Sequence, residues 1–249
     1  MSVQLGRGLK MRLSMDEKTV TKVVSGHERH QPFVMRQFPN VFCPVLKISE
    51  LAEHVSYQMP RLQHAPFEHL DVALLTASPY LEELWARVGV PPLPTWQETL
   101  AARLRTNLAE YGEGLHVDTT ALVAQLVVQE APCVIHGDPT FANLLHDGTR
   151  YYWIDPLTRP FIPGDPHVDL GKLFQSCFGY EYVLVDREPV ARLELCHMLA
   201  THLNLDGRLG YYWCLVHFIR LLPYQLPHQR RTFLTWTRML ALQLQLLTS

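Results

Sequence analysis

Three oxygen-bearing side chains gather around a predicted β-hairpin in the middle of the chain. Asp138 and Asn143 lie on the loop that leads into the hairpin, and Asp155 follows its second strand, Tyr151 to Ile154. A hairpin of this kind can bring the three side chains to one point. Carboxylate and amide oxygens hold Mg²⁺, and a carboxylate can also orient a hydroxyl and receive its proton. The pattern therefore fits transfer of a phosphoryl group from a nucleotide to an alcohol.

This segment also resembles that of a known family. Residues 136–143, His-Gly-Asp-Pro-Thr-Phe-Ala-Asn, resemble the catalytic loop of aminoglycoside phosphotransferases and choline kinases, which have a protein-kinase-like fold. Residues 154–156, Ile-Asp-Pro, resemble the metal-binding segment of the same family. Each piece alone could be an ordinary turn, because Gly, Asp, Asn and Pro are common turn residues. The order and spacing of the pieces together favour the catalytic interpretation.

The resemblance implies a role for each polar residue of the segment. Asp138 would be the catalytic base, and Asn143 and Asp155 would hold Mg²⁺. His136 would shape the catalytic loop. Asp169, further along the chain, would begin a helix and brace this loop from behind, without binding the metal.

Residues for nucleotide binding are less sharply defined by the sequence. In kinase-like folds a strand lysine holds the nucleotide phosphates, often paired with a helix carboxylate, beneath a glycine-rich turn. Lys22 stands where the resemblance places this lysine, and Glu28 is the nearest acid that could pair with it. Gly6 and Gly8 offer only a short substitute for the glycine-rich turn. Other residues compete for the lysine and glutamate roles, namely Lys10, Lys18, Lys47, Glu50 and Glu53.

The segment from Tyr57 to Leu62 resembles the hinge through which this family binds a purine by backbone groups. Met59 and Arg61 lie within it and are therefore candidate nucleotide-binding residues. Side-chain identity says little at a hinge, because the contacts are made by the backbone. For Met59 a core position is the better interpretation, since an isolated Met usually fills space in a core.

The acceptor side of the site leaves two options open. By the resemblance, an acidic pocket would bind a cationic sugar, whereas aromatic walls would bind a quaternary ammonium such as choline. Aromatic residues at helical spacing belong more often to a core than to a binding wall. The aromatic candidates are Tyr180, Tyr182, Tyr211, Tyr212 and Trp213.

The elements that must position these residues change in type along the chain. Strands are expected at Met11 to Met15, Thr19 to Val24, Val41 to Ile48 and Val55 to Met59. A helix is expected over His27 to Phe38 if Pro32 occupies its first turn. Further helices are expected at Tyr80 to Val88, Trp96 to Tyr111, Thr119 to Val128 and from Leu193 onward.

This order, with the resemblance, predicts a bilobal α+β fold of the protein-kinase type. A small β-rich lobe at residues 1–62 would bind the nucleotide, and a larger helical lobe at residues 63–249 would carry the catalytic hairpin. The 249 residues, of which 47% are hydrophobic and 18% charged, can fill the core that such a fold needs.

Charge and cysteine content exclude several other classes of protein. A formal net charge of −2 provides no basic field for a nucleic acid. Five widely spaced cysteines suit a reducing cytoplasm better than a disulfide framework. No apolar run approaches the length that crosses a bilayer. We therefore expect a soluble cytoplasmic protein without nucleic-acid or membrane partners.

The resemblance implies a kinase that uses ATP and Mg²⁺ to phosphorylate a hydroxyl of a small molecule, such as an aminoglycoside, a sugar or choline. GTP in place of ATP stays open, as does a homodimer, because the sequence does not fix the oligomeric state. The thin glycine turn would also suit a nucleotide-binding pseudokinase or scaffold without turnover. A protein acceptor is less favoured, because the His-Gly-Asp loop and Pro156 are closer to small-molecule kinases.

Overall fold

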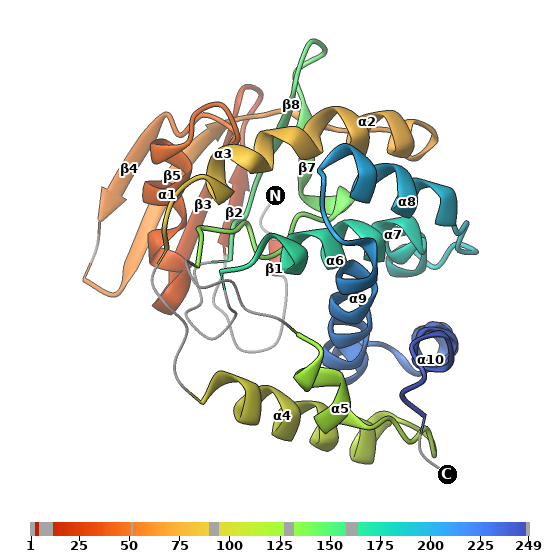
Figure 1. Cartoon of the computed structure of the whole chain (residues 1–249). Coiled ribbons are helices and arrows are strands. Elements are labelled where there is room, and N and C mark those ends of the chain that lie inside the picture. Colours follow the sequence, from red (N-terminus) through yellow and green to blue (C-terminus); the bar gives the residue numbers. More distant parts are fainter. Residues whose placement is uncertain are drawn as a thin grey trace. The chain divides into compact units, whose positions relative to one another are not determined.

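The computed structural model describes residues 3–4, 12–50, 52–89, 95–126, 132–157 and 164–247. Within these ranges, strands dominate the N-terminal part and helices the C-terminal part (Figure 1), so the predicted α+β class is confirmed. The strands are β1 (Val3–Gln4), β2 (Arg12–Met15), β3 (Thr19–Ser25), β4 (Lys47–Glu50), β5 (His54–Pro60), β6 (Gln63–His64), β7 (Leu144–His146) and β8 (Tyr151–Trp153). The α-helices are α1 (Gln31–Gln37), α2 (Leu70–Ala77), α3 (Leu81–Trp85), α4 (Trp96–Tyr111), α5 (Thr119–Ala124), α6 (Pro166–Cys177), α7 (Tyr180–Leu184), α8 (Leu193–His202), α9 (Gly207–Leu221) and α10 (Pro227–Gln243).

The chain divides into two compact units. The first unit comprises Met1–Leu84 and His136–Arg159, and the second comprises Trp85–Ile135 and Pro160–Ser249. The hairpin predicted to be catalytic therefore belongs to the same unit as the N-terminal strands. A lobe boundary near residue 62 stays a prediction.

An antiparallel sheet of five strands, in the order β1-β2-β3-β5-β4, forms the N-terminal part of the first unit (Figure 1). The strands expected at Met11 to Met15 and Thr19 to Val24 are present as β2 and β3, which pair with each other, and β3 pairs on its other side with β5. Side chains of β5 alternate between half-buried and buried, which is the pattern of a strand with one face on a core. Residues buried from β5 are Val55, Tyr57 and Met59.

One predicted strand is wrong over most of its length. Val41 to Ile48 was expected as a continuous strand, but β4 begins only at Lys47. The preceding residues instead pack against the catalytic hairpin, where Cys43 N donates to Trp153 O at 3.0 Å and Trp153 N donates to Val41 O at 3.0 Å. Val41 and Cys43 are fully buried there, so their apolar character reflects this contact rather than a place in the five-stranded sheet.

The helix expected between the third and fourth strands is divided into two parts. A short 3₁₀ helix, Gly26–His30, leads directly into α1, and Pro32 lies in the first turn of α1 as predicted. Proline is tolerated there because its missing N–H would have no partner within the helix. The start of α1 is buried at Gln31, which places a polar side chain beside the sheet.

A second, smaller sheet holds the catalytic hairpin. Its strands run in the order β6-β7-β8, and β7 and β8 form the hairpin that the sequence predicted. Trp153 at the end of β8 is fully buried, and its indole N–H donates to Ala77 O of α2 at 3.1 Å. The hairpin is thus anchored to α2 as well as to the chain before β4.

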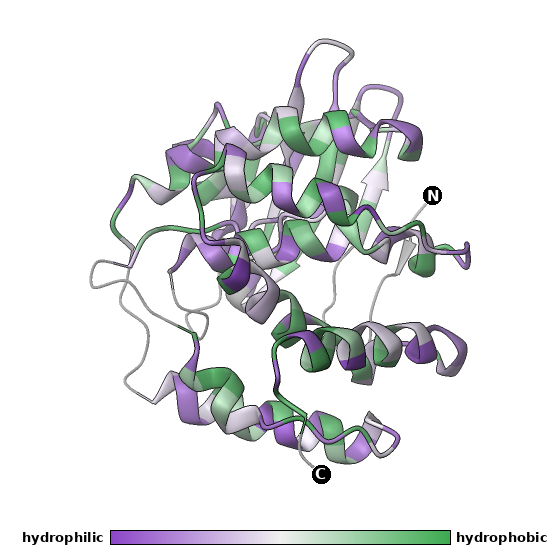
Figure 2. Cartoon of the chain, turned by 45° about the vertical axis from the view of Figure 1, so that its right-hand side comes forward, coloured by the Kyte–Doolittle hydropathy of each residue, from purple (hydrophilic) through white to green (hydrophobic). Residues whose placement is uncertain are grey.

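Helices form most of the second unit, and each carries both hydrophobic and hydrophilic residues (Figure 2). Close packing of α6 on α9 requires glycine, because a Cβ on Gly171 would lie 2.5 Å from the Trp213 Cβ.

The prediction for α4 is confirmed over its full length. The helix expected at Tyr80 to Val88 ends at Trp85, since Val88 leaves it to form a bridge with Cys133. The helix at Thr119 ends at Ala124, before residues 127–128, which lie outside the described ranges.

Neither membrane segments nor disulfides occur in the part of the chain that the structure describes. No helix there combines the length and the apolar character that a bilayer span requires. All five cysteines are buried and have free thiols. Burial raises the pKa of the Cys43 and Cys133 thiols to about 12, so these thiols stay protonated.

Candidate active site

The loop predicted to be catalytic, residues 136–143, depends on a glycine at its second position. Gly137 has a φ of 79°, in the left-handed region that favours glycine. A Cβ there would also lie 2.9 Å from the Leu157 Cβ. Leu157 in turn donates its backbone N–H to His136 O at 2.7 Å. The loop and the chain after Asp155 are therefore in direct contact, and only glycine fits between them.

Asn143 is tied to Asp138 across the catalytic loop. The Asn143 amide nitrogen donates to the Asp138 backbone oxygen at 2.8 Å and to its carboxylate Oδ2 at 3.1 Å. The backbone oxygen of Asn143 accepts from Ile154 N at 3.0 Å, which joins this loop to the residue before Asp155. Both side chains are half-buried. The structure thus brings two of the three predicted residues into direct contact and holds them beside the third.

Asp155 adopts an unusual backbone conformation at the end of β8. Its φ is 59°, in the left-handed region that few residues other than glycine, Asn and Asp adopt. Such conformations persist where the surrounding structure enforces them, and they cluster at functional sites. The Asp155 side chain is 29% exposed, so its carboxylate remains accessible to a ligand.

Lys22 and Asp155 form an ion pair although they are 133 residues apart in the sequence. Lys22 Nζ lies 2.5 Å from Asp155 Oδ1, and the lysine side chain is only 4% exposed. Because a buried ammonium is stable only with charged or polar partners, this pair fixes Lys22 at the candidate site. The structure therefore joins the predicted phosphate-binding lysine to the predicted metal ligand.

The site contains a residue that the sequence analysis missed, Gln31. Lys22 Nζ donates to Gln31 Oε1 at 3.2 Å, and Gln31 Nε2 donates to Glu28 Oε2. Tyr57 Oη also donates to Gln31 Oε1 at 3.2 Å. Gln31 thus links Lys22 to Glu28, the acid predicted as its partner. The one signal in the sequence was the spacing, since Gln31 follows Glu28 by three residues, one helical turn.

His136 is fully buried beneath the catalytic loop. Its ring lies 5.5 Å from the Phe42 ring and 5.6 Å from the Trp153 ring, measured between centroids. Asp138 N donates to His136 Nδ1 at 3.2 Å, which fixes the orientation of the imidazole. Burial lowers the pKa of His136 to about 4, although the nearby Asp138 and Asp155 carboxylates act in the opposite direction. The ring is therefore neutral and supports the loop from its buried side.

This burial predicts an acid-side loss of stability. The pKa of His136 falls from its ordinary 6.5 to about 4 on folding, so between these pH values the unfolded chain binds a proton that the folded chain does not. The free energy of unfolding should therefore decrease as the pH falls through this window, by up to about 3 kcal/mol from His136 alone. Urea unfolding of the wild type and of His136→Gln at pH 7 and pH 5 measures this decrease in the free energy of unfolding.

Comparison of the wild type with His136→Gln isolates the contribution of His136 to the pH dependence of stability. His217, buried in the second unit, also has a pKa lowered by burial, so the wild type alone would report both residues. The His136→Gln protein should be less stable at pH 7 and lose less stability on acidification. Equal pH dependence in the two proteins would show that His136 does not titrate in this way.

Met59 and Arg61 lie at the C-terminal end of β5 and just beyond it. Met59 is 4% exposed and belongs to the core of the first unit. Arg61 is exposed, and its guanidinium donates to Asp16 O at 3.1 Å, in the turn between β2 and β3. Nucleotide binding by the backbone of this segment stays a prediction. Gly6 and Gly8 lie outside the described residues.

Asp169 and the aromatic candidates belong to the second unit. Asp169 lies in the first turn of α6, is fully buried and accepts from the Trp85 indole N–H at 3.0 Å. Tyr212 and Trp213 are buried in the core, where Trp213 stacks on Trp96. The role of Asp169 behind the catalytic loop stays a prediction.

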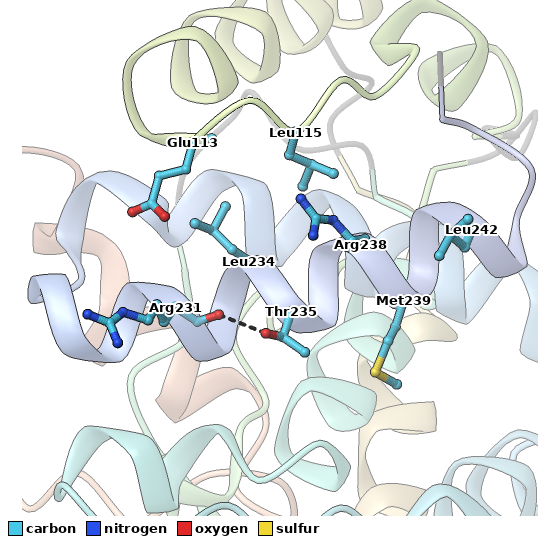
Figure 3. Close-up of a pocket in the computed structure, with 9 residues that line it drawn as sticks. Glu113, Leu115, Arg231, Leu234, Thr235, Arg238, Met239 and Leu242 are labelled. Atoms are coloured by element: carbon cyan, nitrogen blue, oxygen red, sulfur yellow. Dashed lines mark hydrogen bonds between the residues drawn. The ribbon is translucent and has the colours of Figure 1, made fainter. Parts of the chain in front are cut away.

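The second unit also carries a hollow of about 310 Å³. It lies between α10 and the segment that follows α4, with Arg238 directed toward Leu115 and Glu113 above Leu234 (Figure 3). None of its lining residues is a candidate catalytic or nucleotide-binding residue. The hollow is therefore separate from the residues that the sequence singled out.

Oxygen donors at Asn143 and Asp155 suit a magnesium ion. The amide nitrogen of Asn143 is engaged by Asp138, which leaves its oxygen as the atom that can bind a cation. Asp155 uses Oδ1 for Lys22 and has a second carboxylate oxygen. The described residues include no group of three His, Cys, Asp or Glu side chains that could hold a metal. Because Mg²⁺ bound with nucleotide phosphates needs only one or two protein ligands, the pair still fits.

The arrangement of strands, catalytic hairpin and helices is the protein-kinase-like fold, and solved structures match it along nearly the whole chain. The gentamicin-APH(2")-IIa complex has a TM-score of 0.58 and 14% identity, covering 97% of this chain and 90% of that one. Choline kinase LicA from Streptococcus pneumoniae has a TM-score of 0.55 and 11% identity, with coverages of 97% and 93%. Aminoglycoside phosphotransferase APH(3'')-Id from Streptomyces rimosus has a TM-score of 0.51 and 17% identity, with coverages of 97% and 92%.

No protein-family model and no curated protein sequence matches the chain. At identities of 11% to 17%, the structural matches establish the fold. A fold of this kind can carry different activities, so the function must be argued from the residues of the site.

Proposed function

We propose that this protein is an ATP-dependent, Mg²⁺-dependent kinase that phosphorylates a hydroxyl group of a small molecule. The observation that carries the proposal is the ion pair between Lys22 and Asp155, formed beside the Asp138–Asn143 contact. A buried lysine, a carboxylate and a paired Asp and Asn are the groups that phosphoryl transfer requires. The structural neighbours named as choline kinase and aminoglycoside phosphotransferase support the same chemistry.

Each residue has a defined task in this proposal. Lys22 holds the nucleotide phosphates, and Asn143 and Asp155 hold Mg²⁺, which neutralises negative charge on the phosphates when it is bound. Asp138 orients the acceptor hydroxyl for in-line attack and receives its proton. The bond from Asn143 keeps the Asp138 carboxylate in one orientation. We keep ATP as the nucleotide and treat GTP as an alternative for the test.

Two alternative functions, a pseudokinase and a protein kinase, differ from this proposal in turnover or in the acceptor. A pseudokinase would bind nucleotide without turnover. A protein kinase would share the chemistry but act on a polypeptide. The His-Gly-Asp loop and the names of the structural neighbours favour a small-molecule acceptor.

Thermal unfolding with nucleotides tests the proposal on the wild-type chain. A ligand that binds only the folded state at about 100 times its Kd stabilises it by about 2.7 kcal/mol, so MgATP should raise the melting temperature. ATP without Mg²⁺ should raise it less. Release of ADP is then measured with choline, aminoglycosides and sugars as acceptors, and one of them should stimulate it.

The outcomes separate the three functions. No shift of the melting temperature with MgATP or MgGTP would overturn the proposal. A shift without stimulation of ADP release by any small hydroxyl compound, and without slow ATP hydrolysis, would favour the pseudokinase. Stimulation only by a polypeptide would favour the protein kinase.

A further inference from the structure

Gln31 occupies a central place in the polar network around Lys22. It is the first residue of α1, and it is only 4% exposed. Its side-chain oxygen accepts from both Lys22 Nζ and Tyr57 Oη at 3.2 Å, and its nitrogen donates to Glu28. Contacts therefore reach it from the strands β3 and β5 and from the 3₁₀ helix before α1. A buried polar side chain with contacts on all sides has a fixed position.

The chemistry of the amide determines its orientation. Only its oxygen can accept from the ammonium of Lys22, and only its nitrogen can donate to the carboxylate of Glu28. The two lone pairs of the oxygen are both used, one by Lys22 and one by Tyr57. Rotation of the amide by half a turn would break these bonds. Gln31 therefore holds Lys22 in one place and is itself held by Glu28 and Tyr57.

The neutrality of Gln31 matters for the charge of the site. A carboxylate at this position would add a negative charge beside the Lys22 ammonium. An amide instead fixes the ammonium without neutralising it. In the free protein Lys22 also contacts Asp155, and that carboxylate is one of the two proposed Mg²⁺ ligands. The positive charge of Lys22 thus stays directed at the side of the site where polyphosphate and metal would bind.

We propose that Gln31 is a positioning residue for nucleotide binding, acting through Lys22. The inference rests on the proposed function, because it requires that Lys22 binds nucleotide phosphates. It assigns to a neutral residue of α1 the direct contact with this lysine that the sequence analysis expected from Glu28. Glu28 acts through Gln31, by fixing its amide.

A double-mutant cycle tests this inference on the full chain. Gln31→Met keeps the volume of the side chain and removes its hydrogen bonds, and Lys22→Met removes the ammonium. Hydrogen bonds to charged groups are stronger than those between neutral groups. Gln31→Met should therefore raise the Kd for MgATP about ten-fold in the wild-type background. In the Lys22→Met background the same change should raise the Kd for MgATP by less than about two-fold, because Gln31 acts through that lysine.

Controls distinguish positioning from loss of structure. Gln37→Met makes the same substitution on an exposed residue at the other end of α1 and should leave the Kd unchanged. If Gln31→Met does not fold, Gln31→Asn, which is one methylene too short to reach Lys22, replaces it. The melting temperature without ligand identifies the folded variants.

The outcomes also separate this inference from the proposed function. No binding of MgATP by the wild type would overturn the proposed function itself. Binding by the wild type with an unchanged Kd in the folded Gln31 variant would overturn only the role of Gln31. An equal loss in both backgrounds would show that Gln31 acts on the fold and not through Lys22.

Discussion

Replacement of Asp138 by Asn should lower the turnover number by about 100- to 10,000-fold and leave MgATP binding nearly unchanged. Removal of a general base typically costs this much in rate. Asn is close in size and can still accept from the Asn143 amide, so the catalytic loop should keep its shape. It cannot receive the proton of the acceptor hydroxyl. Steady-state kinetics with an accepted substrate, together with the Kd for MgATP, measure both quantities.

Asp71→Asn is a suitable control for this change. Asp71 is an exposed residue of α2 in the same unit, and its replacement should leave kinetics unaffected. A turnover number of Asp138→Asn within about five-fold of the wild type would exclude Asp138 as the base, since that is well below the usual effect. A parallel loss of MgATP affinity would indicate that Asp138 shapes the nucleotide site instead.

Replacement of Asp155 by Asn should abolish the Mg²⁺-dependent part of nucleotide binding and, with it, turnover. The change removes the charge that pairs with Lys22 and one of the proposed Mg²⁺ ligands. It also leaves a nearly buried ammonium without its carboxylate, which should lower the free energy of unfolding by about 1–2 kcal/mol. The measurement is the melting temperature with and without MgATP, beside ATP alone.

Asn is preferable to Ala at this position because Asp155 has a φ of 59°, which Asn tolerates and Ala does not. Asp186→Asn provides a matched control, since Asp186 has a φ of 54° and is exposed in the second unit. It should respond to MgATP as the wild type does. If Asp155→Asn is stabilised by MgATP as strongly as the wild type, Asp155 is not the metal ligand.

Gln31 and the Lys22–Asp155 pair show which contacts of the site could be predicted from nearby residues in the sequence and which could not. The sequence led from a lysine on a predicted strand to Lys22, and from an acid in the next segment to Glu28. The spacing between Glu28 and Gln31 was not enough to place Gln31 between them, because the bonds of a side chain depend on how the helix turns toward the sheet. A neutral residue also gives no charge signal in the sequence.

The apolar residues before β4 show that the packing partner of a buried residue is equally hard to predict from the sequence. Val41 and Cys43 read as strand residues, and both are buried. Their partner is Trp153 of the hairpin, more than a hundred residues away in the sequence, and not the neighbouring strands. Burial alone can therefore be predicted from composition, whereas the surface against which a residue is buried cannot.

From the sequence come the α+β class, most of the helices and strands, and the prediction that Asp138, Asn143 and Asp155 form the site. These features follow from short-range physics, since turn residues, helical periodicity and the spacing of Asp138, Asn143 and Asp155 act within a few tens of residues. The pairing of Lys22 with Asp155, the contact of Gln31 with Lys22 and the left-handed backbone conformation of Asp155 became visible in the folded chain. Each of these depends on segments that are distant in sequence and packed together, and packing is set by the whole unit rather than by any local pattern.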